Sequence, residues 1–199
     1  MTASAVGVET VGVTDTRQRL IDAAIELCTR YTFAGTSLQM IADELGFTKA
    51  AIYHHFRTRE QLLDAVVEPI LDQLRDIIAA AETQRSPHAR AEYMLSGFAQ
   101  LAVDNRVVSV LAADPSVAEM LRARREWDEL IERQMTLLAA VNPGPAGNVK
   151  AAVALAGIAG ASGPTFVDLD REVLREHLLD AGRRVLGLRT PRRQPPTDV

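Results

Sequence analysis

Apolar residues recur along this chain at intervals of three and four positions, the spacing typical of amphipathic helices. The first such stretch is predicted to begin near Asp15, because Asp15 and Gln18 have the spacing of a capping box. Its apolar face includes Leu20, Ala24 and Leu27. Neither a strand pattern nor a long internal repeat interrupts the series, so the sequence predicts an all-α fold of about nine helices.

Two short helices separated by a glycine are predicted between residues 36 and 56. The first begins at Thr36, Gly46 supplies the turn, and Thr48 caps a second helix that runs to Phe56. Helices of about nine residues are too short to be stable alone. We therefore expect them to pack with the preceding helix as a three-helix unit, residues 14–66. A helical hairpin inside a larger bundle is the alternative interpretation.

Longer helices are predicted beyond this unit and form a second domain at residues 67–188. Their predicted ranges are 59–82, 86–105, 114–141, 148–162 and 170–188. Pro69 falls within the first of these helices. It either only curves the helix over the core, or provides a bend through which the second domain moves the first. The terminal segments 1–13 and 189–199 lack periodicity and are predicted to be disordered.

The distribution of charge argues against a protein that binds nucleic acid non-specifically through a large basic surface. The net charge is −4, yet the window from Gly46 to Arg59 carries three basic residues, two histidines and no carboxylate. A short positive face on an acidic protein suits a reader of one groove. Cys28 is the single cysteine, which excludes an internal disulfide and a cysteine-based zinc site, and no other metal or cofactor pattern is present. No signal peptide or membrane span is visible, so we expect a cytoplasmic protein.

The two short helices have the chemistry of a helix-turn-helix. A helix that enters a major groove needs small or polar outward side chains near its start. Ala50 and Ala51 allow close approach and can touch a thymine methyl, and Lys49 can reach a base edge or a phosphate. Hydroxyl, imidazole and guanidinium groups nearby can bind the DNA backbone. The DNA-contacting residues predicted from this pattern are Thr48, Lys49, Ala50, Ala51, Tyr53, His54, His55 and Arg59.

The segment from Thr36 to Leu62 closely resembles the N-terminal signature of the TetR family of bacterial regulators. The spacings that carry the resemblance are those of Ile41-Ala42, Gly46, Tyr53, Phe56 and Leu62. The segment Thr16–Ala24 resembles the first helix of that family, so the resemblance covers residues 15–66.

The resemblance implies a homodimer whose two recognition helices enter successive major grooves of a near-palindromic double-stranded DNA operator. It further implies a repressor that a small molecule releases by binding in the C-terminal domain. It supports most of the contacts predicted above and adds Arg17 and Thr36 to them. Ala50 departs from the family, in which that position is often glycine, so base preference there cannot be borrowed from a relative.

The last two predicted helices differ in side-chain size. Residues 149–162 are dense in alanine and glycine, which lets helix backbones approach closely, whereas residues 170–188 carry a stripe of larger side chains that includes Leu174, Leu178 and Leu188. We predict that this pair builds the dimer interface across a two-fold axis. Ordinary packing within one chain is the alternative.

A ligand pocket is predicted among the helices between residues 86 and 141. Its candidate walls are Tyr93, Met94, Phe98, Met120, Trp127 and Met135. Gln100 and Gln134 are candidate polar anchors, and the lack of a charged cluster predicts an apolar or weakly polar ligand. Core packing is the alternative role for each wall residue.

Three classes of function were weighed. A ligand-responsive repressor fits the sequence best, and a DNA-binding regulator controlled by a protein partner is the alternative. An enzyme is not expected, because no nucleophile elbow, phosphate loop, zinc motif or paired carboxylates are present.

Overall fold

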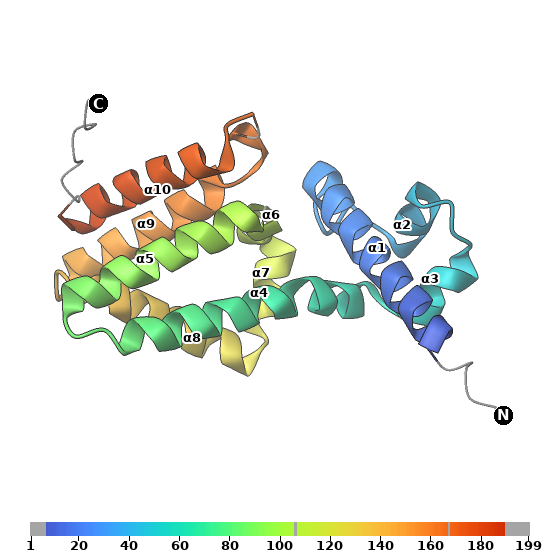
Figure 1. Cartoon of the computed structure of the whole chain (residues 1–199), viewed down its shortest axis with the longest axis horizontal. Coiled ribbons are helices and arrows are strands. Elements are labelled where there is room, and N and C mark those ends of the chain that lie inside the picture. Colours follow the sequence, from blue (N-terminus) through green and yellow to red (C-terminus); the bar gives the residue numbers. More distant parts are fainter. Residues whose placement is uncertain (1–6, 106, 167, 190–199) are drawn as a thin grey trace.

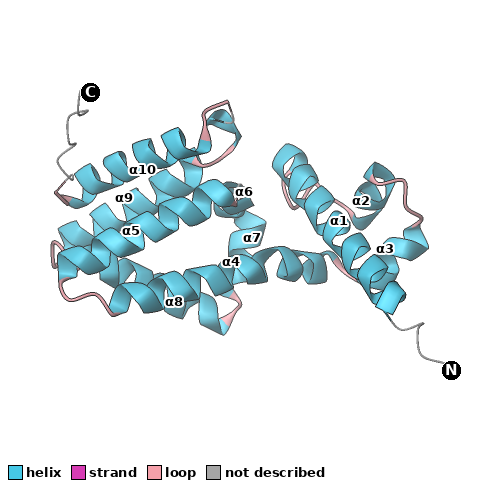
Figure 2. Ribbon diagram, in the orientation of Figure 1, coloured by secondary structure: helices cyan, strands magenta, loops and turns pink. Residues whose placement is uncertain are grey.

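The protein is described by a computed structural model that covers residues 7–105, 107–166 and 168–189. All regular structure in these ranges is helical, as the sequence predicts (Figure 2). The described elements are α1 (Gly7–Tyr31), α2 (Leu38–Glu44), α3 (Lys49–His55), α4 (Arg59–Glu82), α5 (Pro87–Asp104), α6 (Val107–Ala113), α7 (Pro115–Arg122), α8 (Arg125–Ala139), α9 (Pro145–Ala161), a 3-10 turn (Pro164–Phe166) and α10 (Arg171–Leu186). No described helix is both long and apolar enough to span a bilayer.

Helices α1, α2 and α3 gather at one end of the molecule, and α5, α8, α9 and α10 form a bundle at the other (Figure 1). We call residues 7–66 the reading unit and residues 67–189 the body. Helix α4 belongs to both, because its first turns close the core of the reading unit and the rest packs on α5 and α8. The predicted range of α4, 59–82, is confirmed, and the helix continues through Pro69.

Each part has a core of fully buried side chains, which explains why short helices are stable there. In the reading unit the core includes Leu20, Ile41, Ile52 and Phe56. In the body the largest fully buried apolar side chains are Ile78, Met94, Leu95, Leu138 and Leu186.

Helix α1 begins earlier than the sequence predicts. It starts at Gly7, whereas the prediction was Asp15 after a disordered segment 1–13. Residues 7–13 contain no proline, so a helix nucleated further along can extend backwards through them. Residues 1–6 lie outside the described residues, as do residues 190–199 of the predicted C-terminal tail.

The single helix predicted at 114–141 is two helices, α7 and α8, and a further helix, α6, precedes them. The break falls at Arg124, which caps α8 with extended backbone. Its guanidinium forms ion pairs with Asp64 and Glu68 of α4. The break is therefore held by tertiary contacts, and no glycine or proline marks it.

The stripe on α10 packs inside the chain. Leu174, Leu178 and Leu188 are each less than 10% exposed (9%, 7% and 8%), and α10 lies against α5 and α9. The prediction that these side chains face a second copy is corrected, because the body needs them to close its own core.

Candidate nucleic-acid interface and ligand cavity

Side-chain caps fix where α2 and α3 begin. The Ser37 hydroxyl accepts the backbone N–H of Met40 at 3.1 Å, and the Thr48 hydroxyl accepts that of Ala51 at 3.2 Å. Gly46 lies between the two helices with a φ of 66°, in the left-handed region that favours glycine. These features build the predicted helix-turn-helix, with α2 starting two residues later than expected.

Helix α3 has one buried side and one open side. Ile52 is fully buried, and Phe56, just after the helix, is 2% exposed, so both anchor α3 to the reading unit. Lys49, Ala50 and His54 are exposed on the open side. Tyr53 is 42% exposed there, and the Lys49 ammonium lies 5.6 Å from its ring centre. The open side thus combines small, cationic and hydroxyl groups at the start of the helix, as a groove reader requires.

Two arginines of α1 extend this positive surface. The guanidinium carbon of Arg17 lies 5.1 Å from the Phe56 ring centre, and that of Arg19 lies 5.1 Å from the Phe47 ring centre. Both side chains are exposed, so their charges remain available beside α3. Partial burial, together with the neighbouring His54 and Arg17, lowers the pKa of His55. In the free protein this favours the uncharged imidazole at neutral pH.

Thr36 does not lie on this surface. Its side chain is 4% exposed, and its hydroxyl donates to the Thr32 carbonyl at 2.8 Å. The expectation of a Thr36 side-chain contact with DNA is corrected, because this hydroxyl is used inside the turn between α1 and α2. The N-cap of α2 is Ser37, the residue after Thr36. The sequence pattern alone did not show which of these two adjacent hydroxyl residues caps the helix.

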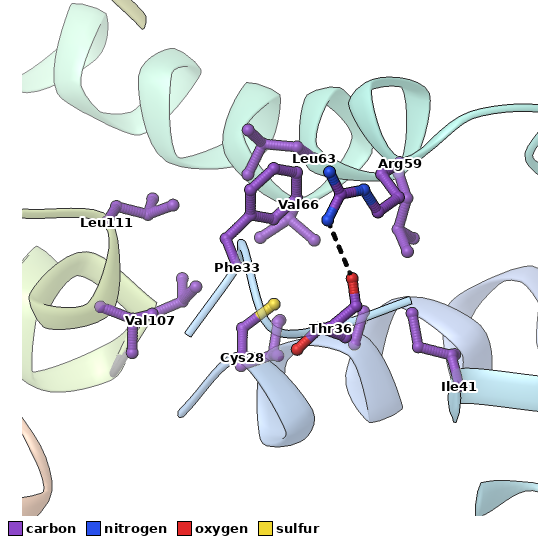
Figure 3. Close-up of a pocket in the computed structure, with 13 residues that line it drawn as sticks. Cys28, Phe33, Thr36, Ile41, Arg59, Leu63, Val66, Val107 and Leu111 are labelled. Carbon is purple, nitrogen blue, oxygen red and sulfur yellow. Dashed lines mark hydrogen bonds between the residues drawn. The ribbon is translucent and has the colours of Figure 1, made fainter. Parts of the chain in front are cut away.

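Arg59 also points inward (Figure 3). Its Nη1 donates to the carbonyls of Ala34 and Thr36 at 3.1 and 3.3 Å, and its guanidinium carbon lies 5.5 Å from the Phe33 ring centre. The guanidinium therefore ties the α1–α2 turn to the start of α4. Its predicted contact with the DNA backbone stays a prediction, since Arg59 is only half-buried and these hydrogen bonds use Nη1 alone.

The reading unit and the body meet where the α1–α2 turn reaches the start of α7. The buried carboxylate of Asp114 accepts a hydrogen bond from the backbone N–H of Phe33 at 2.8 Å. It also caps α7, because it accepts a hydrogen bond from the backbone N–H of Ser116 at 2.9 Å. Burial opposes ionisation of this carboxyl, but hydrogen bonds from Ser116, Phe33 and Ala34 outweigh it and lower the pKa of Asp114. The charge, and with it the link, therefore persists at neutral pH. Thr32 precedes the link with a φ of 67°, an uncommon conformation for a β-branched residue.

A junction cavity of about 20 Å³ lies beside this link, between α1, α4 and α6 (Figure 3). It holds no more than a water molecule. Cys28 faces it, and burial raises the pKa of the Cys28 thiol, which is therefore protonated and unreactive at neutral pH. Leu111 of α6 lines this cavity and also a larger one in the body.

The ligand cavity of the body has a volume of about 360 Å³, within the range of about 300–1,000 Å³ typical of small-molecule sites. Helices α4 to α9 all contribute to its wall, which is almost entirely apolar. Of the predicted wall residues, Phe98, Trp127 and Met135 line it.

The other predicted wall residues lie elsewhere. Tyr93 is 44% exposed, Met94 is fully buried in the core, and Met120 is half-buried outside the lining. Gln100 is exposed and donates to Asp104. The predicted pocket also lacked the walls from α4 and α9, because the prediction was limited to residues 86–141. The apolar faces of those two helices could have indicated these walls, because they include the lining residues Ile70, Leu74 and Leu155.

Gln134 lines the ligand cavity and is 1% exposed. Its Nε2 has no hydrogen-bond partner among the described residues. An unmade hydrogen bond at a buried amide costs about 1–3 kcal/mol. The predicted polar anchor therefore lines the cavity and has a buried donor without a partner among the described residues.

Comparison with known proteins agrees with this geometry. Residues 20–66 match the family model described as bacterial regulatory proteins of the tetR family. Residues 20–66 therefore carry the DNA-binding signature of the TetR family. The matched residues contain α2, α3 and the turn between them, so the family signature coincides with the helix-turn-helix of the structure.

Curated transcriptional regulators match part of the chain. The transcriptional repressor KstR2 of Rhodococcus jostii is 30% identical over 82 residues, which cover 39% of this chain and 40% of that protein. The transcriptional regulator UidR of Escherichia coli is 30% identical over 115 residues, which cover 54% of this chain and 57% of that protein. The matched segments thus span less than two thirds of the length of these relatives.

A likeness in fold to a solved transcriptional regulator extends over most of the chain. The solved structure of the ketosteroid transcriptional regulator KstR2 of Mycobacterium tuberculosis aligns with a TM-score of 0.68 and 17% identity. The alignment covers 94% of this chain and 97% of that one. At this identity the likeness concerns the fold alone.

Proposed function

We propose that the protein is a sequence-specific DNA-binding transcriptional regulator, a repressor that a small, largely apolar ligand releases from its operator. The observation that carries the proposal is α3, held by Ile52 and Phe56 with Lys49, Ala50 and Tyr53 turned outward. The regulators UidR and KstR2 support it as relatives that are 30% identical over part of the chain.

The proposed contacts with double-stranded DNA come from α3 and its neighbours. Lys49, Ala50 and Ala51 would meet base edges, because they lie on the first turn of α3. The remaining proposed contacts, mainly to phosphates, are Arg17, Thr48, Tyr53, His54 and His55.

We propose that the protein binds a near-palindromic operator as a homodimer that pairs through α9. Val149 and Val153 are 63% and 53% exposed on the outer face of that helix. A Cβ placed on Gly157 or Gly160 would meet nothing within 4 Å. Glycine inside a helix costs up to about 1 kcal/mol relative to alanine, and no close contact within the described chain explains it here. A second α9 packing closely against this face does.

The proposed route of release runs through α6 and α7. Leu111 and Ala112, at the end of α6, line the ligand cavity, and Asp114 follows them. A ligand that shifts this segment would move the Asp114 link to Phe33, and with it the turn that Arg59 and Thr36 hold. The two reading units need a separation of about 34 Å to enter successive major grooves, so a small rotation of each would weaken binding. A bend of α4 at Pro69 would assist the same motion.

The test is selection of genomic DNA fragments by the full-length protein, followed by mobility-shift titration at several salt concentrations. We expect a preferred fragment with two half-sites and affinity that falls as salt rises. Lys49→Ala should weaken binding to it about tenfold and relax preference at one base position, whereas Tyr53→Phe should weaken all sequences alike. Arg85→Ala, which removes an exposed charge in the turn after α4, is the matched control and should change little. Equal binding to all fragments would contradict the proposal.

Control by a protein partner is the alternative regulation. The ligand cavity favours a small molecule over it, since a partner acting at the surface would not require a space of about 360 Å³ inside the body.

A further inference from the structure

The ligand cavity has one buried polar feature in an apolar wall. Aliphatic side chains from α4 and α9 form two sides, and the rings of Phe98 and Trp127 contribute to others. Gln134 of α8 interrupts this surface with a buried amide whose Nε2 has no partner among the residues described. An occupant that filled only the apolar volume would leave this donor unpaired.

We propose that the cavity selects a neutral, apolar ligand that carries one hydrogen-bond acceptor, a carbonyl oxygen, placed against Nε2 of Gln134. Binding of the apolar part of the ligand is favourable, because it removes apolar surface of the ligand and of the cavity wall from water. The carbonyl makes binding specific. A cavity with a buried donor binds an analogue that lacks the acceptor more weakly, because the donor then stays unpaired. This inference rests on the proposed function for its biological role, but the binding chemistry can be tested without DNA.

A water molecule is a poorer partner for Gln134 than a ligand carbonyl. Buried water is stable when it makes two to four hydrogen bonds. The other side chains that line the cavity are apolar, apart from Arg122. A carbonyl needs only the one donor that Gln134 supplies.

The buried end of the ligand must be neutral. Arg122 is the charged residue in the cavity lining, and its side chain is exposed at the end of α7. An ionised carboxylate placed beside Gln134 would lose its hydration and gain only an amide, which is strongly unfavourable. An acid is therefore expected to bind far more weakly than a ketone of the same skeleton.

Trp127 offers a direct readout, because it is the single tryptophan of the chain and lines the ligand cavity. The experiment titrates the full-length protein with 1-phenylbutan-1-one and with butylbenzene, which share a carbon skeleton and differ in the carbonyl. Both should change Trp127 fluorescence. The ketone should bind about tenfold more tightly than the hydrocarbon, the effect of one well-made hydrogen bond at a buried site.

Two variants of Gln134 complete the test. Gln134→Leu and Gln134→Met keep the volume of the side chain and remove the amide, so both should still bind butylbenzene and lose the tenfold preference for the ketone. Gln100→Leu, at an exposed position of α5, is the matched control and should retain the preference. A carbonyl stretching frequency that is lowered in the native complex, and restored in the variants, would confirm the hydrogen bond.

Three results would overturn the inference: no change in Trp127 fluorescence with either probe, equal affinity for both probes, or a preference that survives in both Gln134 variants. The proposed function is tested independently, by the mobility-shift titration in the absence of either probe. Loss of specific DNA binding with the ketone preference intact would remove the regulatory role and leave the cavity chemistry standing.

Discussion

Arg59 and Thr36 illustrate how much the direction of a side chain decides its role. Both fall within the segment that resembles a DNA-binding signature, and both residue types commonly bind phosphate. In the structure they contact each other instead, since the Arg59 guanidinium donates to the Thr36 carbonyl. The hydroxyl of Thr36 is also used within the turn. At this scale the residue type identifies a possible chemistry, and the local backbone decides whether it faces DNA or the core.

Arg59→Ala should therefore lower the free energy of unfolding by about 2 kcal/mol, because two carbonyls lose a charged donor and Phe33 loses a stacked cation. Arg59→Lys should recover only part of this, since an ammonium cannot stack on the ring and reach both carbonyls in one plane. Urea denaturation without DNA measures the effect.

The control for that experiment is Arg57→Ala at an exposed position, where a change within about 0.5 kcal/mol is expected. If Arg59→Ala weakened DNA binding and left stability unchanged, the guanidinium would belong at the DNA backbone after all.

The helices themselves follow local signals closely where those signals are strong. Serine or threonine caps mark the starts of α3, α4 and α5 in the sequence, and the structure keeps all three. Helix α6 was missed because its valine-rich sequence has low helix propensity and is stabilised by packing against α1 and α9. The break between α7 and α8 was missed for the related reason that ion pairs to α4 hold it.

The turn between α2 and α3 makes a prediction at this scale. Gly46→Ala meets no atom within 4 Å but must adopt a φ of 66°, so it should destabilise the protein by about 1 kcal/mol. Gly46→Asn should cost less, because asparagine tolerates the left-handed region better. Thermal unfolding followed by circular dichroism distinguishes the two. Equal Tm values for native protein and Gly46→Ala would mean that the turn relaxes to another conformation.

The whole molecule joins a reading unit to a body through shared elements. Helix α4 belongs to both cores, and Asp114 connects the turn after α1 to the cap of α7. Helix α9 likewise has two roles, since Leu155 and Ala159 line the ligand cavity while Gly157 and Gly160 lie open on the outer side. A ligand, a second copy and DNA can thus each act on the same connected set of helices.

At this scale we predict that Gly157→Leu and Gly160→Leu weaken dimerisation at least about tenfold without unfolding the protomer. The side chains have room within the chain but would separate two paired α9 helices. Sedimentation velocity across a concentration series measures the change. Ala79→Leu, at an exposed position of α4, is the control. An unchanged association constant in both glycine variants would place the dimer interface elsewhere.

Local patterns in the sequence are sufficient to predict the all-α class, the helix-turn-helix and the residues on the open side of α3. They are sufficient because helical periodicity, hydroxyl caps and a glycine turn act over a few neighbouring residues. The sequence also identified Gln134, Phe98 and Trp127 as candidates for the cavity. Which of the candidates come together depends on the folded chain, because burial depends on contacts between residues far apart in the sequence. Arg59 and Leu174 turned inward for that reason, and Gln134 was left in an apolar cavity with an unpaired donor.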